Sequence, residues 1–344
     1  MNELRESLLA LGVADPEAAV CVHALLGSDP ALLAQAGDLP QSRTETDEWV
    51  KATFLHPEGP FLEAAASAVA AVLGEDPDKS TDDVLGHLTT RPRTVYDLRA
   101  LTGLTEADLA ALLPRLAEAG LIRADPNPLE PDDPYWTMEH RFARFHYAMV
   151  AAHLPRWRRG YITDRLWAMT RARFDRYVCR PEFNRLAREW ALNDPAVAAT
   201  TRVTVPDPRF RQLRTLELAA WNDQGAPVAL GTVRWKFPMA ERQLKRLRHV
   251  KRLLGDPKAR LYCIAPRFEA AITADPDPNL FVIGPAQLLR REKPKAEATP
   301  PRDASDNASD NASDNAPDRA PESPPKGDLH PISRLVGPER RRVG

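Results

Sequence analysis

The order of the patterned segments between residues 180 and 285 constrains the fold of this chain more than any other feature. A helix-like segment, PEFNRLAREWAL, is followed by three strand-like segments, TRVTV, RTLELAAW and VALGTVRWK. A long amphipathic segment, MAERQLKRLRHVKRLL, and the strand-like segments RLYCIA and LFVIG come next. Asp223 and Gly225 predict a hairpin turn over 222–225, between the second and third strands. We therefore expect an α/β module whose order is helix, three strands, helix and strand.

The region before this module is patterned as helices. Up to about residue 75, apolar residues recur at helical spacing in three groups, at Leu4, Leu8 and Leu11, at 18–26 and at 61–73. Three shorter helices are then expected, from Thr81 to Leu88, from Thr94 to a stop at Gly103, and from the capping pair Thr105 and Asp108 to Gly120. The extended segments LIRAD and YWTM follow them. Three short helices and a hairpin are typical of a winged helix-turn-helix.

The charge of this winged helix argues against base reading. Its would-be recognition helix carries Glu106, Asp108 and Glu118 against a single Arg115, and its would-be wing, ADPNPLEPDDP, is acidic. Duplex binding depends on Lys and Arg side chains that neutralise phosphates. We therefore expect a structural or protein-docking role for this module.

Charge is divided along the chain. Residues 1–140 hold 9 Lys and Arg against 25 Asp and Glu, residues 141–293 hold 30 against 14, and residues 294–344 hold 8 against 9. The segment 141–190, which is patterned as helical, alone contains twelve arginines and four acidic residues. Such asymmetry predicts either a polyanionic partner for the basic part or docking of the acidic and basic parts on each other.

The cysteines and the apolar runs indicate a reduced, cytoplasmic protein. Cys21, Cys179 and Cys263 are odd in number and far apart in sequence, so we expect structural thiols rather than a disulfide framework. The longest apolar run near the N-terminus is interrupted by charged residues and a proline at 15–17. This run therefore predicts neither a membrane span nor a signal peptide, and no membrane partner is expected.

Several motifs in combination make the chain similar to a known family. HPEGPFLEAA, the winged helix, YWTMEHRFARFHYAMV, FNRLAREW and GTVRWK, over roughly residues 50 to 265, resemble the C-terminal half of an archaeal-type AAA+ family of predicted ATPases. The resemblance implies an uncharacterised PD-(D/E)XK nuclease-like domain behind a lid and a winged helix. In that family the ATPase domain lies upstream. No GxxxxGK[ST] occurs in this sequence, so we expect no nucleotide cofactor and no ATPase activity.

The resemblance and the patterning together predict an α+β protein of five parts. These are a helical lid-like segment at 1–79, a winged helix at 80–138, an Arg-rich helical connector at 139–179, a degenerate PD-(D/E)XK-like domain at 180–291 and a tail at 292–344. The tail is rich in Pro and contains three copies of Ala-Ser-Asp-Asn, so we expect it to be disordered. Its last segment, 329–344, is either a solvated end or a short motif that orders on a partner.

Four positions decide whether the nuclease-like domain can cut. Such chemistry needs acidic residues on adjacent strands to hold a divalent cation, and a lysine that helps to activate water. The resemblance places Asn184, Glu217, Thr232 and Arg234 where the family has two glutamates, an aspartate and a lysine, and only Glu217 is acidic. Strand alternation would put Thr232, Arg234 and Lys236 on one face, where two cations repel a metal. We expect no catalytic residue and no metal, and either an ordinary sheet or a site that binds phosphate without cutting it.

The helix after that strand has a basic face. At 100° per residue its leucines and a valine gather on one side and its cations on the other, with Glu241 as the only acid. The predicted nucleic-acid-binding residues are Arg234, Lys236, Arg242, Lys245, Arg246, Arg248, His249 and Arg252. A face of one sign suits sequence-independent contact with DNA or RNA phosphates. Docking on the acidic front half is the main alternative.

The sequence leaves three functions open. The first is a noncatalytic, nucleic-acid-binding or regulatory protein. The second is an interaction module that docks on a separate AAA+ ATPase or another protein. The third is a metal-dependent nuclease whose missing acids are replaced, for example by Glu182 or Asp207 joining Glu217. A remnant without retained activity is a further alternative.

Overall fold

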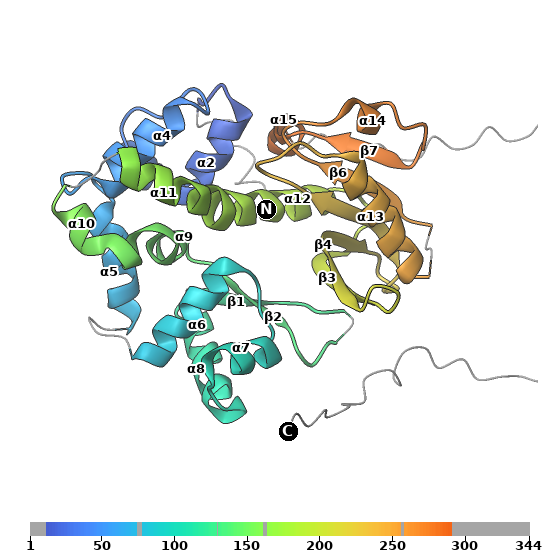
Figure 1. Ribbon diagram of the computed structural model, residues 1–344, viewed down its shortest axis with the longest axis horizontal. Coiled ribbons are helices and arrows are strands. Elements are labelled where there is room, and N and C mark those ends of the chain that lie inside the picture. Colours follow the sequence, from blue (N-terminus) through green and yellow to red (C-terminus); the bar gives the residue numbers. More distant parts are fainter. Residues whose placement is uncertain (1–11, 74–77, 129, 161–163, 256–257, 291–344) are drawn as a thin grey trace, which may run out of the picture. The chain divides into compact units, whose positions relative to one another are not determined.

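A five-stranded mixed sheet forms the centre of the α/β module, with the strand order β3-β4-β5-β6-β7 (Figure 1). The strands are β3 (Ala199–Asp207), β4 (Gln212–Trp221), β5 (Pro227–Val233), β6 (Arg260–Ile264) and β7 (Leu280–Ile283). β3, β4 and β5 form an antiparallel meander, and β6 and β7 continue the sheet in parallel. The predicted turn at 222–225 is confirmed by the hydrogen bond from the Gly225 amide to the Asn222 carbonyl, 3.0 Å long.

The computed structural model describes residues 12–73, 78–128, 130–160, 164–255 and 258–290. The predictions for Leu4, Leu8 and Leu11 and for the tail at 292–344 concern residues outside these ranges. Within them the predicted α+β class is confirmed, with a helical N-terminal part ahead of the sheet.

Helices cover both faces of the sheet. α13 (Glu241–Leu253) packs its apolar side onto one face, where α14 (Ala270–Thr273) also lies. α12 (Arg180–Ala191) packs onto the other face, together with α2 (Pro16–Leu26) and α15 (Pro285–Arg290). Alternation along β5 accounts for both layers, because Ala229 faces the α12 side and Leu230 faces the α13 side. The two helices of the predicted order thus lie on opposite faces.

The N-terminal part consists of short helices, and the first two of them begin at aspartate caps. After α2 come α3 (Pro30–Gln35), α4 (Glu45–Val50), the π-helical turn η1 (Lys51–Leu55) and α5 (Leu62–Leu73). The side chains of Asp15 and Asp29 accept hydrogen bonds from the first turns of α2 and α3, and each is followed by a proline. This combination is favourable at a helix start, since proline lacks an amide that would be unpaired there.

The winged helix is present at residues 79–138. It consists of α6 (Lys79–Thr90), α7 (Val95–Thr102), α8 (Glu106–Glu118) and the antiparallel hairpin of β1 (Ile122–Asp125) and β2 (Tyr135–Met138). Thr94 caps α7, Gly103 ends it with φ of 74°, and Thr105 and Asp108 form the predicted capping box of α8. α6 begins earlier than predicted, because Asp78 rather than a threonine caps it.

The hairpin of the winged helix contacts the protein's own sheet. The Thr201 hydroxyl on β3 donates a 2.6 Å hydrogen bond to the Pro126 carbonyl, and the Arg202 guanidinium lies 5.3 Å from the centre of the Tyr135 ring. Glu106, Asp108, Arg115 and Glu118 on α8 are exposed, as the sequence predicted. Because the hairpin is in contact with β3, a structural role for this module is favoured over groove binding by the wing.

A helical connector joins the winged helix to the sheet. It runs through α9 (Arg141–Phe145), η2 (His146–Val150), η3 (Ala151–His153), α10 (Leu154–Arg158), α11 (Asp164–Phe174) and η4 (Asp175–Cys179), which leads directly into α12. Its aromatic residues Phe145, Trp157 and Phe174 are fully buried. The main hydrophobic cluster contains them together with residues of α2, α12 and the sheet, so it joins the connector to the N-terminal segment and crosses the predicted boundary at 179.

The acidic and basic parts meet through this connector. Arg171 Nε lies 2.7 Å from Asp47 Oδ1, and Arg43 donates a 2.9 Å hydrogen bond to Asp175. Arg158 also forms a two-pronged hydrogen bond with Glu63, with both distances 2.8 Å. Part of the charge division therefore reflects docking within the chain, as one of the two sequence hypotheses proposed.

The cysteines are free and buried. Cys21 on α2 and Cys179 on η4 are 158 residues apart in sequence, yet their Sγ atoms lie 3.4 Å from each other. Burial raises the pKa of the Cys179 thiol well above its ordinary value, and the neighbouring Cys21 raises it further. This pair acts as apolar packing between two helices, which agrees with the predicted structural role of the thiols.

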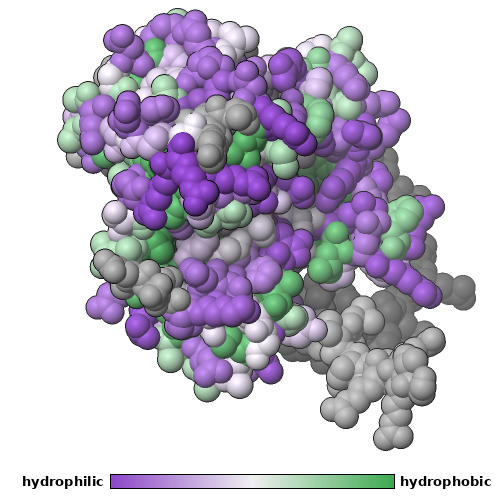
Figure 2. Space-filling view, turned by 60° about the vertical axis from the view of Figure 1, so that its left-hand side comes forward, coloured by the Kyte–Doolittle hydropathy of each residue, from purple (hydrophilic) through white to green (hydrophobic). Residues whose placement is uncertain are grey.

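The surface shown in Figure 2 is mostly hydrophilic, and its hydrophobic residues lie in small separate groups. In the part of the chain that the structure describes, no helix combines the length and apolarity needed to cross a bilayer.

Candidate functional site

The candidate site lies where β4 and β5 separate. The register between them runs from the turn to Leu218 and Gly231, whereas β4 continues beside β3 as far as Gln212 opposite Asp207. A Cβ atom on Gly231 would lie 3.0 Å from Leu218 Cδ2, so glycine permits the close approach of the two strands at this last pair. Glu217 and Thr232 are the next residues along the separating strands. Glu217, Thr232 and Arg234, three of the four positions that the resemblance singled out, thus lie along this separation.

One face of α12 completes the site. Arg180, Asn184 and Arg188 follow each other at intervals of four residues and share that face. Arg180 Nη2 lies 3.0 Å from Glu217 Oε1, and Arg188 Nη1 donates a 3.3 Å hydrogen bond to the Glu217 carbonyl. Glu217, the only acid among those four positions, therefore has an arginine as its partner. A carboxylate paired in this way is a poorer ligand for a divalent cation, because the metal must displace the guanidinium.

Asn184 lies between these two arginines along the helix. Its side chain is 8% exposed, and its Oδ1 has no hydrogen-bond partner among the described residues. A buried amide oxygen without a partner costs free energy, and such groups are uncommon in folded proteins. Asn184 Oδ1 can therefore still accept a hydrogen bond on the helix face that carries the partners of Glu217.

Four arginines, which we call the arginine cluster, surround the site: Arg180, Arg234, Arg242 and Arg246. Burial lowers the pKa of Arg234, and the positive charges of Arg242, Arg180 and Arg246 lower it further. Burial and then the charge of Arg214 lower the pKa of Arg246, while Glu217 opposes this. Guanidinium groups that destabilise one another's charge form a site of positive potential, and a bound anion would relieve the repulsion.

The arginine cluster has little compensating charge. Glu217 is the only carboxylate that forms an ion pair with any of its four members among the described residues. No hydrogen bond or ion pair joins the cluster to the described residues between 12 and 138. The acidic front half, which pairs with the connector, thus leaves these four arginines without a partner from that half.

The other predicted binding residues are divided between two environments. Arg248 is bound to Asp275 and Asp277, at 2.7 and 3.1 Å, and Lys245 Nζ lies 2.9 Å from Glu241. His249 Nε2 lies 2.8 Å from Asp207 Oδ2, and Asp207 also pairs with Arg214. Arg252 and Lys236 are exposed, and no ion pair to either occurs in the described ranges. The structure therefore brings Arg234, Arg242 and Arg246 together and gives Lys245, Arg248 and His249 partners within the chain.

The strand that carries Thr232 is shorter than predicted. β5 ends at Val233, and only the Arg234 amide continues the ladder, with a 2.9 Å hydrogen bond to the Ile264 carbonyl. Trp235 turns into the core, where its ring packs on Phe183 at 5.1 Å and its indole donates to Asp175. Of the three residues predicted to share one strand face, only Thr232 therefore lies on β5, because the strand ends before Arg234 and Lys236.

The proposed substitute acids have other partners. Glu182 is 1% exposed, and its carboxylate binds His23 and Arg185 and lies within 4 Å of Arg141 and Arg144. Asp207 is held by Arg214 and His249. In the described ranges, no three or more His, Cys, Asp or Glu residues are grouped as a metal site. Neither Glu182 nor Asp207 is placed to join Glu217 without giving up these bonds.

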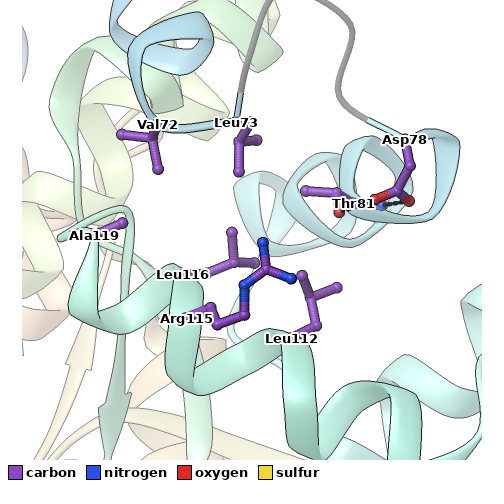
Figure 3. Close-up of a pocket in the computed structure, with 8 residues that line it drawn as sticks. All are labelled: Val72, Leu73, Asp78, Thr81, Leu112, Arg115, Leu116 and Ala119. Carbon is purple, nitrogen blue, oxygen red and sulfur yellow. Dashed lines mark hydrogen bonds between the residues drawn. The ribbon is translucent and has the colours of Figure 1, made fainter.

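A pocket of about 150 Å³ lies elsewhere, in the winged helix (Figure 3). The end of α5, the start of α6 and the face of α8 line it, with Leu112, Arg115 and Leu116 on α8. The guanidinium of Arg115 extends across this space in Figure 3, and Asp78 is turned toward Thr81, which it caps. The arginine cluster is separate from this pocket and lies at a strand end beside two helices.

Comparison with known proteins gives little guidance. Neither the protein-family models nor the curated proteins contain a match. Among solved structures, a probable transcriptional regulator from Pseudomonas aeruginosa aligns with 32% of this chain and 86% of its own, at 18% identity and a TM-score of 0.22. A similarity at that level supports no argument about function, so the function has to be argued from the site.

Sequence reasoning missed two residues of the site, Arg180 and Arg188. The signal was present, because both stand four residues from Asn184: Arg188 lies on the predicted helix and Arg180 directly precedes it. Searching that helix face for partners of Glu217 would have found them.

Proposed function

We propose that this protein binds the phosphate backbone of nucleic acid through the arginine cluster and does not cleave it. The observation that carries the proposal is the grouping of four arginines with a single paired carboxylate, Glu217. Burial lowers the pKa values of Arg234 and Arg246, and neighbouring arginines lower them further. A polyanion binds most favourably to cations that have no carboxylate partner, because no existing ion pair has to be broken first. In evolutionary terms, the chain would be a noncatalytic relative of the C-terminal half of the AAA+ family that its motifs resemble.

The salt dependence of binding tests this proposal. We expect purified protein to bind oligonucleotides at low salt, with log Kd rising against log salt at a slope of about 3, because about four phosphates would be engaged. Fluorescence anisotropy with labelled DNA and RNA measures the slope. Absence of binding at about 50 mM salt, or a slope near zero, would remove the proposal.

Glu217 gives a prediction that separates binding from metal-dependent cleavage. We expect Glu217→Gln to tighten binding about two- to fivefold, because it removes the carboxylate that faces the phosphates and releases Arg180. Glu118→Gln, which makes the same charge change on the exposed surface of α8, is the matched control and should change affinity less. Weaker binding by Glu217→Gln, or loss of a Mg²⁺-dependent cleavage activity, would favour a nuclease instead.

A further inference from the structure

Two exposed phenylalanines flank the arginine cluster. Phe210, in the turn between β3 and β4, is 52% exposed, and Phe237, which follows β5, is 57% exposed. Only one further aromatic side chain, Tyr96 on α7, is exposed to a similar degree among the described residues. Large apolar rings left in water are unfavourable by the hydrophobic effect, so their position beside the cluster requires an explanation.

Cations surround both rings and connect them to the cluster. The guanidinium of Arg234 lies 5.8 Å from the centre of the Phe237 ring, and Lys236 Nζ lies 5.7 Å from it. The guanidinium of Arg214 lies 5.2 Å from the centre of the Phe210 ring, and its charge is among those that lower the pKa of Arg246. Arg246 also donates a 3.3 Å hydrogen bond to the carbonyl of Thr215, the residue after Arg214. The two rings and the cluster therefore make up a surface in which each ring has a cation beside it.

We infer that this surface takes single-stranded nucleic acid in preference to a duplex. The inference rests on the phosphate binding proposed above and adds the class of strand. The face of a base is available to an aromatic side chain only where the base is unpaired, whereas a duplex presents phosphates and base edges. A groove that combines cations for the backbone with aromatic rings for stacked bases is the arrangement used to hold single strands. Neither ring would contribute to contact with duplex phosphates.

The two sources of such a strand, DNA and RNA, present the same phosphates and base faces. The surface described here therefore accepts either, and both strands are included in the test. A preference for DNA or RNA would indicate contacts with the sugar, which the arginines and phenylalanines are not expected to make.

The experiment compares strands and variants under one salt condition. Labelled oligonucleotides of about 16 nucleotides, as single-stranded DNA, single-stranded RNA and the DNA duplex, are titrated with the full chain. Phe210→Leu and Phe237→Leu keep an apolar side chain but remove the stacking ring, and Tyr96→Leu is the matched control. Unchanged thermal unfolding establishes that each exposed substitution leaves the fold intact.

We expect the wild-type protein to bind a single strand at least about tenfold more tightly than the duplex, and each phenylalanine variant to weaken that binding about fivefold or more. The same variants and Tyr96→Leu should leave duplex binding within about twofold. Equal affinity for strand and duplex, with no effect of either phenylalanine, would overturn this inference while leaving phosphate binding in place. Failure to bind any of the three oligonucleotides would overturn both.

Discussion

Reversing two charges of the arginine cluster, with Arg234→Glu and Arg246→Glu together, is expected to weaken nucleic-acid binding by roughly 100-fold or more at low salt. Each substitution removes a cation that forms no ion pair with a carboxylate among the described residues and puts an anion in its place. The slope of log Kd against log salt should fall by about two, one for each lost phosphate contact.

The same double variant should fold at least as well as the wild type. Burial lowers the pKa values of Arg234 and Arg246, and neighbouring arginines lower them further, so removing the two cations relieves desolvation and repulsion in the folded state. Loss of binding together with an unchanged or higher melting temperature would therefore show that Arg234 and Arg246 serve to bind a ligand and do not stabilise the fold. Anisotropy and thermal unfolding measured on one preparation check both halves of this expectation.

A control with the same formal charge change is available on the winged helix. Lys79 and Arg99 are exposed and pair with Asp83 and Glu106. The double variant Lys79→Glu and Arg99→Glu should retain binding within a fewfold, because both cations already have partners and lie outside the cluster. If reversal of the cluster left affinity within about threefold of the wild type, or the control lost as much, the binding surface would lie elsewhere.

Removing the buried carboxylate of Glu182 is expected to destabilise the fold by about 3–5 kcal/mol in the variant Glu182→Ala. Its oxygens bind His23 at 2.5 Å and Arg185, and the fully buried imidazole would be left without this partner. Arg144, 5% exposed, would also lose its nearby negative charge. Because small proteins are stable by only about 5–15 kcal/mol in total, urea unfolding should detect the change readily.

Two companion variants distinguish the buried network from an ordinary ion pair. Glu182→Gln keeps an acceptor for His23 and should lose less stability than the alanine variant. Glu189→Ala removes the partner of Arg185 on the same helix, where the carboxylate is 35% exposed, and should cost about 1 kcal/mol or less. If Glu182→Ala and Glu189→Ala lowered the free energy of unfolding equally, burial would not be what makes the Glu182 carboxylate important for stability.

The pH dependence of stability provides a separate check on Glu182. Burial raises the pKa of its carboxyl, but the charges of Arg185 and His23 outweigh burial and hold the pKa well below its ordinary value. The ionised Glu182 carboxylate therefore contributes its full stabilisation above the pKa of an unfolded glutamate, about 4.3. This contribution is lost as the pH falls toward the pKa of Glu182 in the folded protein. The wild type should lose more stability than Glu182→Gln between about pH 5 and pH 3, and parallel losses would contradict the assignment.

Features set by neighbouring residues could be predicted from the sequence. The caps at Thr94 and Thr105, the stop at Gly103 and the turn at 222–225 depend on hydrogen bonds and dihedral angles within four or five residues. The spacing of hydrophobic residues predicts the order of helices and strands and the apolar side of α13. It does so because each helix or strand must bury its hydrophobic side in the core. The sequence alone therefore determined the α+β class, the winged helix and the basic helix beside the sheet.

Only the tertiary structure decided which cations have partners. Arg248 meets Asp275 and Asp277, 27 and 29 residues away, and Arg180 meets Glu217 across 37 residues. The burial of Trp235 just after β5 likewise depends on distant residues, since its ring packs on Phe183 and its indole donates to Asp175. Periodicity identifies the charged face of a helix, but the charge that remains free on that face depends on which distant carboxylates the fold brings within about 4 Å. That dependence on long-range contacts is the reason why the arginine cluster could be located only from the structure.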